Sequence, residues 1–244
     1  MKSCVHLSKM TSSMCHQPEL CRQFALAFSL SSLLLLGGCS ELPIQVSKEE
    51  PKVNVSAISE TTTASKALPA SKACTKTSWK YVCQPDIRFK TLRRERVVAG
   101  EAVVIRISKI IVHIGLKIDT QLPEKVASEI VEHEKGHVAI CLDNYKNAQE
   151  IADRAAQPWV GKTLQGEGST FRDAVKKILT DAQKDIEQQY LADTADAVTE
   201  TSSIYDRLTT ENSKSDYIMH AVSDAQIEYK RLKPGLKSPQ NKSR

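Results

Sequence analysis

The feature that most constrains the fold is a change of hydrophobic period in the middle of the chain. Between residues 101 and 122, "EAVVIRISKIIVHIGLKIDTQL", apolar and polar side chains alternate, which is typical of strands with one buried face. The phase of this alternation changes around Lys109 and predicts a bulge or turn there. From Pro123, which suits a first helical position, to about residue 156 the apolar residues follow a helical period instead. The alternating apolar residues are Ile105, Ile107, Ile114, Leu116 and Ile118.

Other segments extend this α and β pattern. "WKYVC" at 79–83 and "IRFKTL" at 87–92 have the aromatic and β-branched content of short strands. A second long helix is predicted at about 168–200, with Ser169 as its cap, and a third, short helix at about 215–232. We therefore expect an α+β fold in which a small antiparallel sheet packs against two long helices.

The N-terminus indicates export. Residues 24–36, "FALAFSLSSLLLL", match the length of a signal-peptide apolar core and are too short for a comfortable membrane span. The "LGGC" that ends at Cys39 resembles the bacterial lipobox, and this resemblance implies lipidation of Cys39. Residues 1–38 would then be a lipoprotein signal peptide. Because Ser40 is no inner-membrane retention signal, the resemblance implies attachment to the outer membrane, with the domain facing the periplasm.

Composition predicts how the rest of the chain is divided. Residues 39–72 are rich in Ser, Thr, Ala, Lys and Glu and lack aromatics, so we expect a flexible tether there. The folded domain should span residues 73–232, and residues 233–244 should be a disordered tail. The formal charge of +5 falls to +3 once residues 1–38 are removed, and no basic run with interleaved aromatics occurs. Nucleic acid is therefore a poor partner for this chain.

The exported chain keeps Cys39, Cys74, Cys83 and Cys141. Lipidation of Cys39 would leave three thiols in an oxidising compartment, which favours one disulfide. The pair Cys74 and Cys83 is close in sequence, and the pair Cys83 and Cys141 is the alternative. The sequence does not choose between them.

The helical segment contains "HEKGH", with His133 and His137 four residues apart. At 100° per residue both histidines fall in the centre of the apolar stripe, facing the rest of the domain. Two inward rings on neighbouring turns, about 6 Å apart along the axis, can converge on one divalent ion. Glu134 lies beside the pair and can reach a metal-bound water as the catalytic base. Gly136 would let a strand or a substrate backbone approach. The other interpretation is a pair of hydrogen-bonded core histidines.

These residues also carry a resemblance to a known family. "HEKGH" is similar to the H-E-x-x-H motif of zincin metallopeptidases. Together with "DTQLP" at 119–123 and "YDRLT" at 205–209, it resembles the bacterial domain of unknown function 922 family, described as secreted zinc-dependent proteases. The resemblance covers roughly residues 79–230 and implies a zincin-like fold. The family reads Y-D-x-x-T-x-H-G where this chain has Glu211 and Asn212 in place of His and Gly.

The resemblance implies hydrolysis of peptide bonds by a Zn²⁺-activated water. A catalytic zinc needs three protein ligands, and Glu211, in the family's histidine position, is the first choice for the third. The alternatives are Asp206, His220 and Glu200, whereas His113 is more typical of an ordinary strand residue. Tyr205 could donate to the oxyanion, and Asp206 could orient a ligand from behind.

The substrate would be a peptide or protein, which the strand around residues 110–120 could align by edge pairing. Two other functions remain open at this point. One is a non-catalytic envelope lipoprotein with a binding or structural role, and the other is a zinc-dependent amidase acting on cell-wall peptides.

Overall fold

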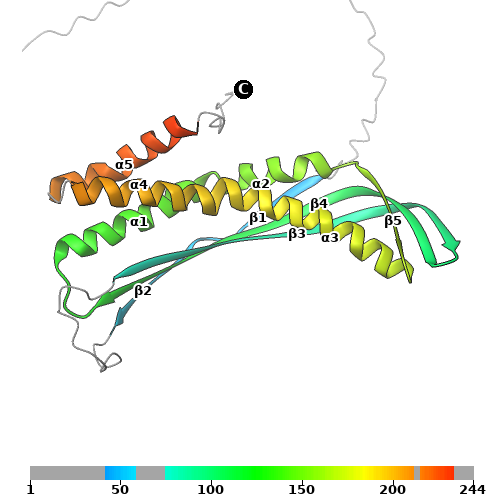
Figure 1. Cartoon of the computed structure of the whole chain (residues 1–244), viewed down its shortest axis with the longest axis horizontal. Coiled ribbons are helices and arrows are strands. Elements are labelled where there is room, and N and C mark those ends of the chain that lie inside the picture. Colours follow the sequence, from blue (N-terminus) through cyan, green and yellow to red (C-terminus); the bar gives the residue numbers. More distant parts are fainter. Residues whose placement is uncertain (1–41, 59–74, 212–214, 234–244) are drawn as a thin grey trace, which may run out of the picture. The chain divides into compact units, whose positions relative to one another are not determined.

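The structure is a computed structural model that describes residues 42–58, 75–211 and 215–233 (Figure 1). The side chains of residues 211, 215, 216 and 219 lie outside this description. The described residues belong to one compact unit, which contains both hydrophobic clusters of the core. The predicted signal peptide at 1–38, the lipidated Cys39 and the predicted tail beyond Lys233 lie outside the described residues.

The sheet is organised around one long central strand, β4 (Gly100–Pro123). β3 (Lys76–Val97) pairs antiparallel with β4 along nearly its whole length. The other side of β4 is covered in succession by three short strands from separate parts of the chain. These are β5 (Thr163–Gly168), antiparallel, then β1 (Ile44–Lys48) and β2 (Lys52–Ile58), both parallel.

The predicted change of phase in β4 is confirmed as a β-bulge. Arg88 pairs with Lys109 but Phe89 pairs with Ile107, so Ser108 has no partner on β3. Before the bulge the odd-numbered residues of β4 are buried, and after it the even-numbered ones. The extra residue therefore keeps the apolar side chains of both halves on one face, as the side-chain period of two requires.

The helices all cover that one face of the sheet (Figure 1). α1 (Ser128–Lys146), α2 (Ala148–Ala156) and α3 (Phe171–Leu191) contact the strands directly. A π-helical turn (Ala192–Asp196) continues α3 into α4 (Ala197–Glu211), which packs with α5 (Ser215–Leu232) over α1. This segregation of helices to one side of a sheet is an α+β arrangement.

Two sequence expectations about the strands are wrong. The predicted tether at 39–72 contains β1 and β2, and the sheet is mixed rather than antiparallel because both strands run parallel to β4. Composition predicted a tether because short strands at the edge of a sheet need few apolar residues. Ile44 is buried, but every residue of β2 is exposed.

The predicted helix boundaries also need correction. The first helix starts at Ser128 rather than at Pro123, because β4 continues to Pro123, and it breaks at Asn147. Thr170, not Ser169, caps α3 and accepts a hydrogen bond from the Asp173 backbone N–H. The predicted short helix at 215–232 is confirmed as α5.

The structure bears on one of the two proposed disulfides. Cys83 and Cys141 are both free, buried thiols, so they do not pair with each other. Cys74 lies outside the described residues. The predicted pairing of Cys74 with Cys83 therefore stays a prediction.

Candidate metal centre

The two histidines of the "HEKGH" segment lie on adjacent turns of α1, as predicted. Their ring centroids are 5.0 Å apart and the ring planes are nearly perpendicular. His137 is buried, whereas His133 keeps 29% of its side chain exposed. The pair therefore lies at the boundary between the core and solvent.

Asp206 of α4 completes a cluster with both rings. Its Oδ1 lies 3.3 Å from His133 Nε2 and 3.0 Å from His137 Nε2. One ligand atom from each of the three residues lies within 4.8 Å of the other two. Asp206 keeps 54% of its side chain exposed, so the cluster opens toward solvent on the α4 side.

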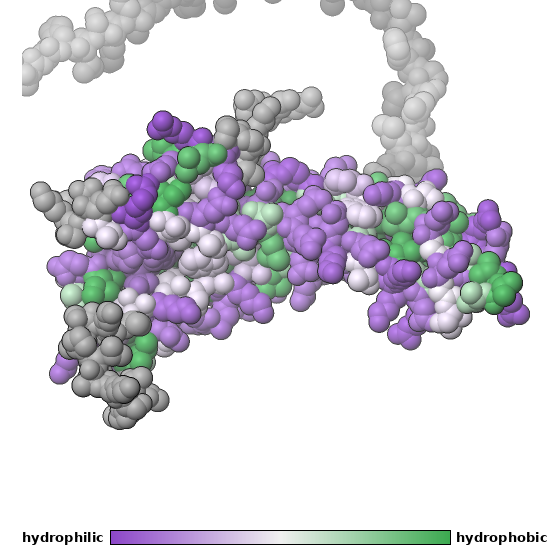
Figure 2. Space-filling view, viewed as in Figure 1, coloured by the Kyte–Doolittle hydropathy of each residue, from purple (hydrophilic) through white to green (hydrophobic). Residues whose placement is uncertain are grey.

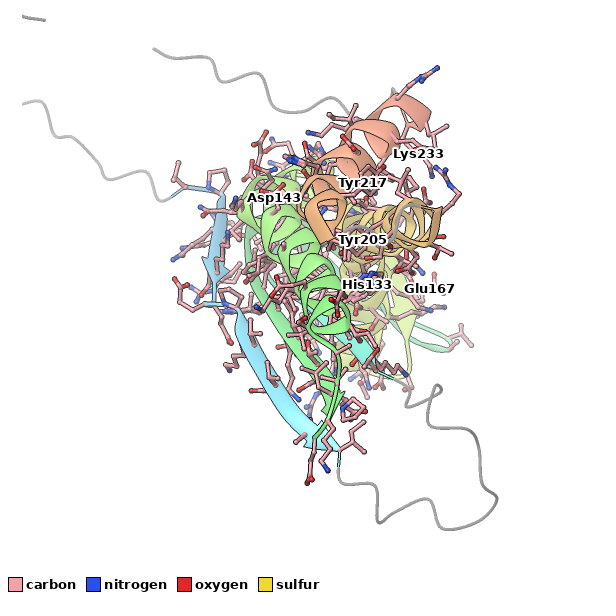
Figure 3. The ribbon with its side chains drawn as sticks, turned by 90° about the vertical axis from the view of Figure 1, so that its left-hand side faces the viewer. His133, Asp143, Glu167, Tyr205, Tyr217 and Lys233 are labelled. Carbon is pink, nitrogen blue, oxygen red and sulfur yellow. The ribbon has the colours of Figure 1, made fainter. Side chains whose placement is uncertain are left out.

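One turn of α4 holds His133 in place. The fully buried Tyr205 stacks on the His133 ring at 5.0 Å between centroids and donates a hydrogen bond to the His133 carbonyl (Figure 3). Thr209 Oγ1 lies 3.3 Å from His133 Nδ1 and 2.9 Å from the Tyr205 carbonyl. The single hydroxyl proton of Thr209 goes to that carbonyl, so Nδ1 donates to Thr209. Nε2 of the same ring faces Asp206 Oδ1, where a metal ion could take the place of a proton shared between the two atoms.

Gly136 makes this close approach of α4 possible. A Cβ at position 136 would collide with the hydroxyl and ring of Tyr205. The space that the sequence suggested for a strand or a substrate backbone is therefore occupied by an aromatic ring of the same chain.

β3 contributes to the opposite side of α1. Thr77 donates a 2.5 Å hydrogen bond to Glu134 Oε2, and Thr120 of β4 supports Thr77 at 3.2 Å. Trp79, two residues further along the same face of β3, stacks on His137 with 6.4 Å between centroids. Glu134 is buried and oriented by the sheet, beside the histidine pair.

The electrostatics of the cluster favour a charged carboxylate. Burial alone would raise the pKa of Asp206, but hydrogen bonds from His133 and His137 hold it well below its usual range. Burial, together with the negative charges of Asp206 and Glu134, raises the pKa of Tyr205 to about 12. Tyr205 therefore stays a neutral hydrogen-bond donor at physiological pH.

The donor geometry fits a tetrahedral divalent ion. Bonds of about 2.0–2.1 Å place tetrahedral ligand atoms about 3.3 Å apart, close to both carboxylate–imidazole separations. Two imidazoles and one carboxylate are a zinc-type donor set. One feature opposes the fit. His137 Nδ1 is buried without a hydrogen-bond partner among the described residues, and a metal-bound ring would carry its proton on that atom.

The structure revises the predicted roles of several residues. Asp206 contacts the Nε2 atoms of both histidines, which is the position of a metal ligand rather than of a residue that orients a ligand through its other ring nitrogen. The hydroxyl of Tyr205 is already bonded to a backbone carbonyl, so it is not available to an oxyanion. Glu211 ends α4, about 140° round the helix from Asp206, and its side chain lies outside the described residues.

The remaining predicted alternatives for a third ligand do not reach the cluster. His113 and His220 are exposed, on β4 and α5 respectively, and are not part of the cluster. Glu200 accepts a hydrogen bond from Lys233 on the surface.

The sequence did contain a signal for the true arrangement. Tyr205, Asp206 and Thr209 are the residues of "YDRLT" that match the family pattern, and all three contact the histidine pair. By contrast, no sequence pattern indicated Thr77 and Trp79, because their contribution depends on the position of β3 under α1.

Comparison with known proteins gives no relative. No family model matches the chain, and no curated protein and no solved structure is significantly similar to it. Within the described residues, no helix is long and apolar enough to cross a membrane.

Proposed function

We propose that the His133–His137–Asp206 cluster binds zinc and that the chain hydrolyses peptide bonds. The observation that carries this proposal is the convergence of two imidazole nitrogens on one carboxylate oxygen at tetrahedral-ligand spacing. The solvent-open side at Asp206 supports a catalytic rather than a closed structural site, because catalytic zinc keeps one position for water or substrate.

A bound zinc ion would supply Lewis-acid activation of a water and of the scissile carbonyl. Glu134 would take the water's proton and deliver it to the leaving amine. Thr77 orients the Glu134 carboxylate through its hydrogen bond, and Tyr205 and Thr209 fix the His133 ring. Positioning of this kind matters because a catalytic group must lie within hydrogen-bond reach of the proton that it transfers.

A peptide substrate would pair with β3 rather than with the strand predicted from sequence. Residues 110–120 of β4 are paired on both sides, by β3 and by β1 and β2, so this strand has no free edge there. Within the described residues β3 pairs with β4 alone, and its outer edge is open to an extended peptide. The segment next to the cluster contains Thr77 and Trp79.

The cellular setting follows from the N-terminal resemblance. The chain would be exported and held by a lipid on Cys39 in the cell envelope, at the outer membrane facing the periplasm. Similarity to the zincins and to the domain of unknown function 922 family is part of the same proposal.

The first test is metal content and peptidase activity of residues 41–244. Asp206→Ala should lower zinc affinity by at least tenfold, because one of three ligands is lost. Glu134→Gln should keep the metal and lose most of the turnover. Glu132→Gln is the matched control, because Glu132 is on the same helix and bonds only Lys135 within the described residues. Full activity of Glu134→Gln would refute the assigned base.

A non-catalytic envelope lipoprotein with a binding or structural role is the second candidate. The partnerless His137 Nδ1 favours it, because a histidine that ligates zinc usually donates its second ring nitrogen to an acceptor. Zinc bound at one equivalent, without hydrolysis of any peptide in a diverse library and without an effect of Glu134→Gln on the melting temperature, would support this candidate.

A further inference from the structure

The face of the sheet opposite the helices carries an unusual arrangement of charge. Between Lys76 and Lys90 of β3 the residues that point to this face are exposed, except the half-buried Val82, whereas Tyr81, Cys83 and Ile87 are buried under the helices. Three cross-strand residue pairs on this open face consist of two cations each. They are Lys80 with Lys117, Arg88 with Lys109, and Lys90 with Arg106.

Like charges placed directly opposite each other destabilise a sheet. Lys52 of β2 also lies opposite Lys117, which adds a third cation to that row. Asp119 pairs with Lys117 at 3.0 Å, and Glu49 with Lys52 at 3.5 Å. Lys80, Arg88 and Lys90 are exposed and have no ion-pair partner within the described part of the chain. Charge of this kind is compensated when an external anion covers it.

Two further features point to a membrane as the source of that anion. Val98 is fully exposed in the turn that ends the β3–β4 hairpin, and Figure 2 shows hydrophobic residues among hydrophilic ones at that end. Leu92, at the register shift of β3 six residues before Val98, is half-exposed. The aromatic residues Trp79, Tyr81 and Phe89 belong to the opposite, helix-covered alternation of β3. The open face therefore lacks the stacking platforms of a single-stranded nucleic-acid site.

The start of the described chain lies at the edge of this part of the sheet. Ile44 of β1 pairs with Ile110, next to the Arg88–Lys109 pair. Cys39, the predicted lipid attachment point, precedes Leu42 by three residues, which span at most about 10 Å. An anchor there would hold this part of the sheet close to the bilayer.

We propose that the open face of β3 and β4, with the hairpin tip, docks on an anionic phospholipid membrane. The cations contact the headgroups, and Leu92 and Val98 enter the interface. This docking is separate from the metal cluster, which lies on the helix-covered face. It also holds for the unlipidated domain, so its test does not depend on hydrolysis or on Cys39.

The test measures binding of residues 41–244 to vesicles of phosphatidylcholine with and without an equal part of phosphatidylglycerol. Each cation near an anionic surface raises partitioning about fivefold. Lys80→Gln, Arg88→Gln and Lys90→Gln combined should weaken binding on the order of 100-fold. The matched control combines Lys176→Gln, Lys177→Gln and Lys184→Gln, which change exposed lysines of α3 and the net charge equally. Because α3 lies on the opposite face, screening should limit the control to less than about threefold.

A second variant, which combines two substitutions, tests whether a membrane is what covers this face. Leu92→Ser with Val98→Ser should weaken vesicle binding but leave the melting temperature unchanged, because neither side chain is buried. Melting curves of the triple glutamine variant should show no loss of stability, which excludes misfolding as the cause of weaker binding. The proposal is overturned if the two triple variants weaken binding equally, or if the phosphatidylglycerol vesicles bind no better than neutral ones. Tighter binding to duplex DNA than to vesicles would overturn it too.

Discussion

Gly136→Ala tests whether α4 approaches α1 as the candidate site requires. A Cβ at position 136 would lie closer to the Tyr205 ring and hydroxyl than real Cβ atoms approach their neighbours. Overpacking of this kind costs about 1–3 kcal/mol. Alanine recovers up to about 1 kcal/mol of helix propensity relative to glycine. We expect Gly136→Ala to reduce the free energy of unfolding by about 1 kcal/mol.

The sharper quantity is the coupling between this substitution and one at Tyr205. Tyr205→Leu removes the ring that the new methyl group would strike, so in that background Gly136→Ala should stabilise by up to about 1 kcal/mol. Urea unfolding of the four proteins should therefore give a coupling energy of about 1–3 kcal/mol. A domain of this size shifts by about 2–4 °C per kcal/mol, so the difference is also visible in melting temperatures.

If the effects of Gly136→Ala and Tyr205→Leu on stability were additive, more than the contact between these two positions would be refuted. Asp206 follows Tyr205 on the same turn of α4, so a coupling below about 0.5 kcal/mol would mean that the turn does not lie against α1. The cluster of His133, His137 and Asp206 would then not form. Zinc titration of Gly136→Ala gives an independent check, because displacement of this turn should weaken zinc binding.

Three further predictions concern other parts of the chain. Lys90→Glu should raise stability by about 0.2–1 kcal/mol in thermal melts, because it replaces a like-charge pair with Arg106 by an ion pair. Burial raises the pKa of both Cys83 and Cys141 to about 12. Peptide mapping after alkylation of the native protein at pH 8 should therefore find both thiols unmodified. The stability that the two neutral thiols provide should be lost as the pH rises from about 9 toward 12. Thr170→Ala should cost about 1 kcal/mol in urea unfolding, through loss of the α3 cap; an unchanged midpoint would contradict the cap.

Local patterns in the sequence predicted the features that depend on near neighbours. The bulge next to Lys109, the inward position of His133 and His137, and α5 all follow from periodicity within one segment. The third member of the cluster depends on how α4 crosses α1, which no single segment encodes. Glu211 was chosen because of its place in a motif, but Asp206 is the residue that contacts the rings.

The strands β1 and β2 show a different limit of sequence reasoning. Their composition is that of an unstructured linker, and β2 buries none of its side chains. Such a strand is held by backbone hydrogen bonds to β4, and backbone pairing leaves little trace in residue type. Thr77 and Trp79 were missed for a related reason, since their role comes from strand register rather than from a motif.

The coverage of one long strand by three short, separate segments has a consequence for biosynthesis. β1 and β2 emerge first from the ribosome, but their partner β4 is made about 65 residues later, so neither can pair until the hairpin exists. Until then one edge of the apolar strand β4 would present a long row of unpaired backbone N–H and C=O groups, the kind of template on which chains aggregate. A truncation that removes residues 42–58 should therefore leave a protein whose helices can still form but which self-associates through the exposed strand.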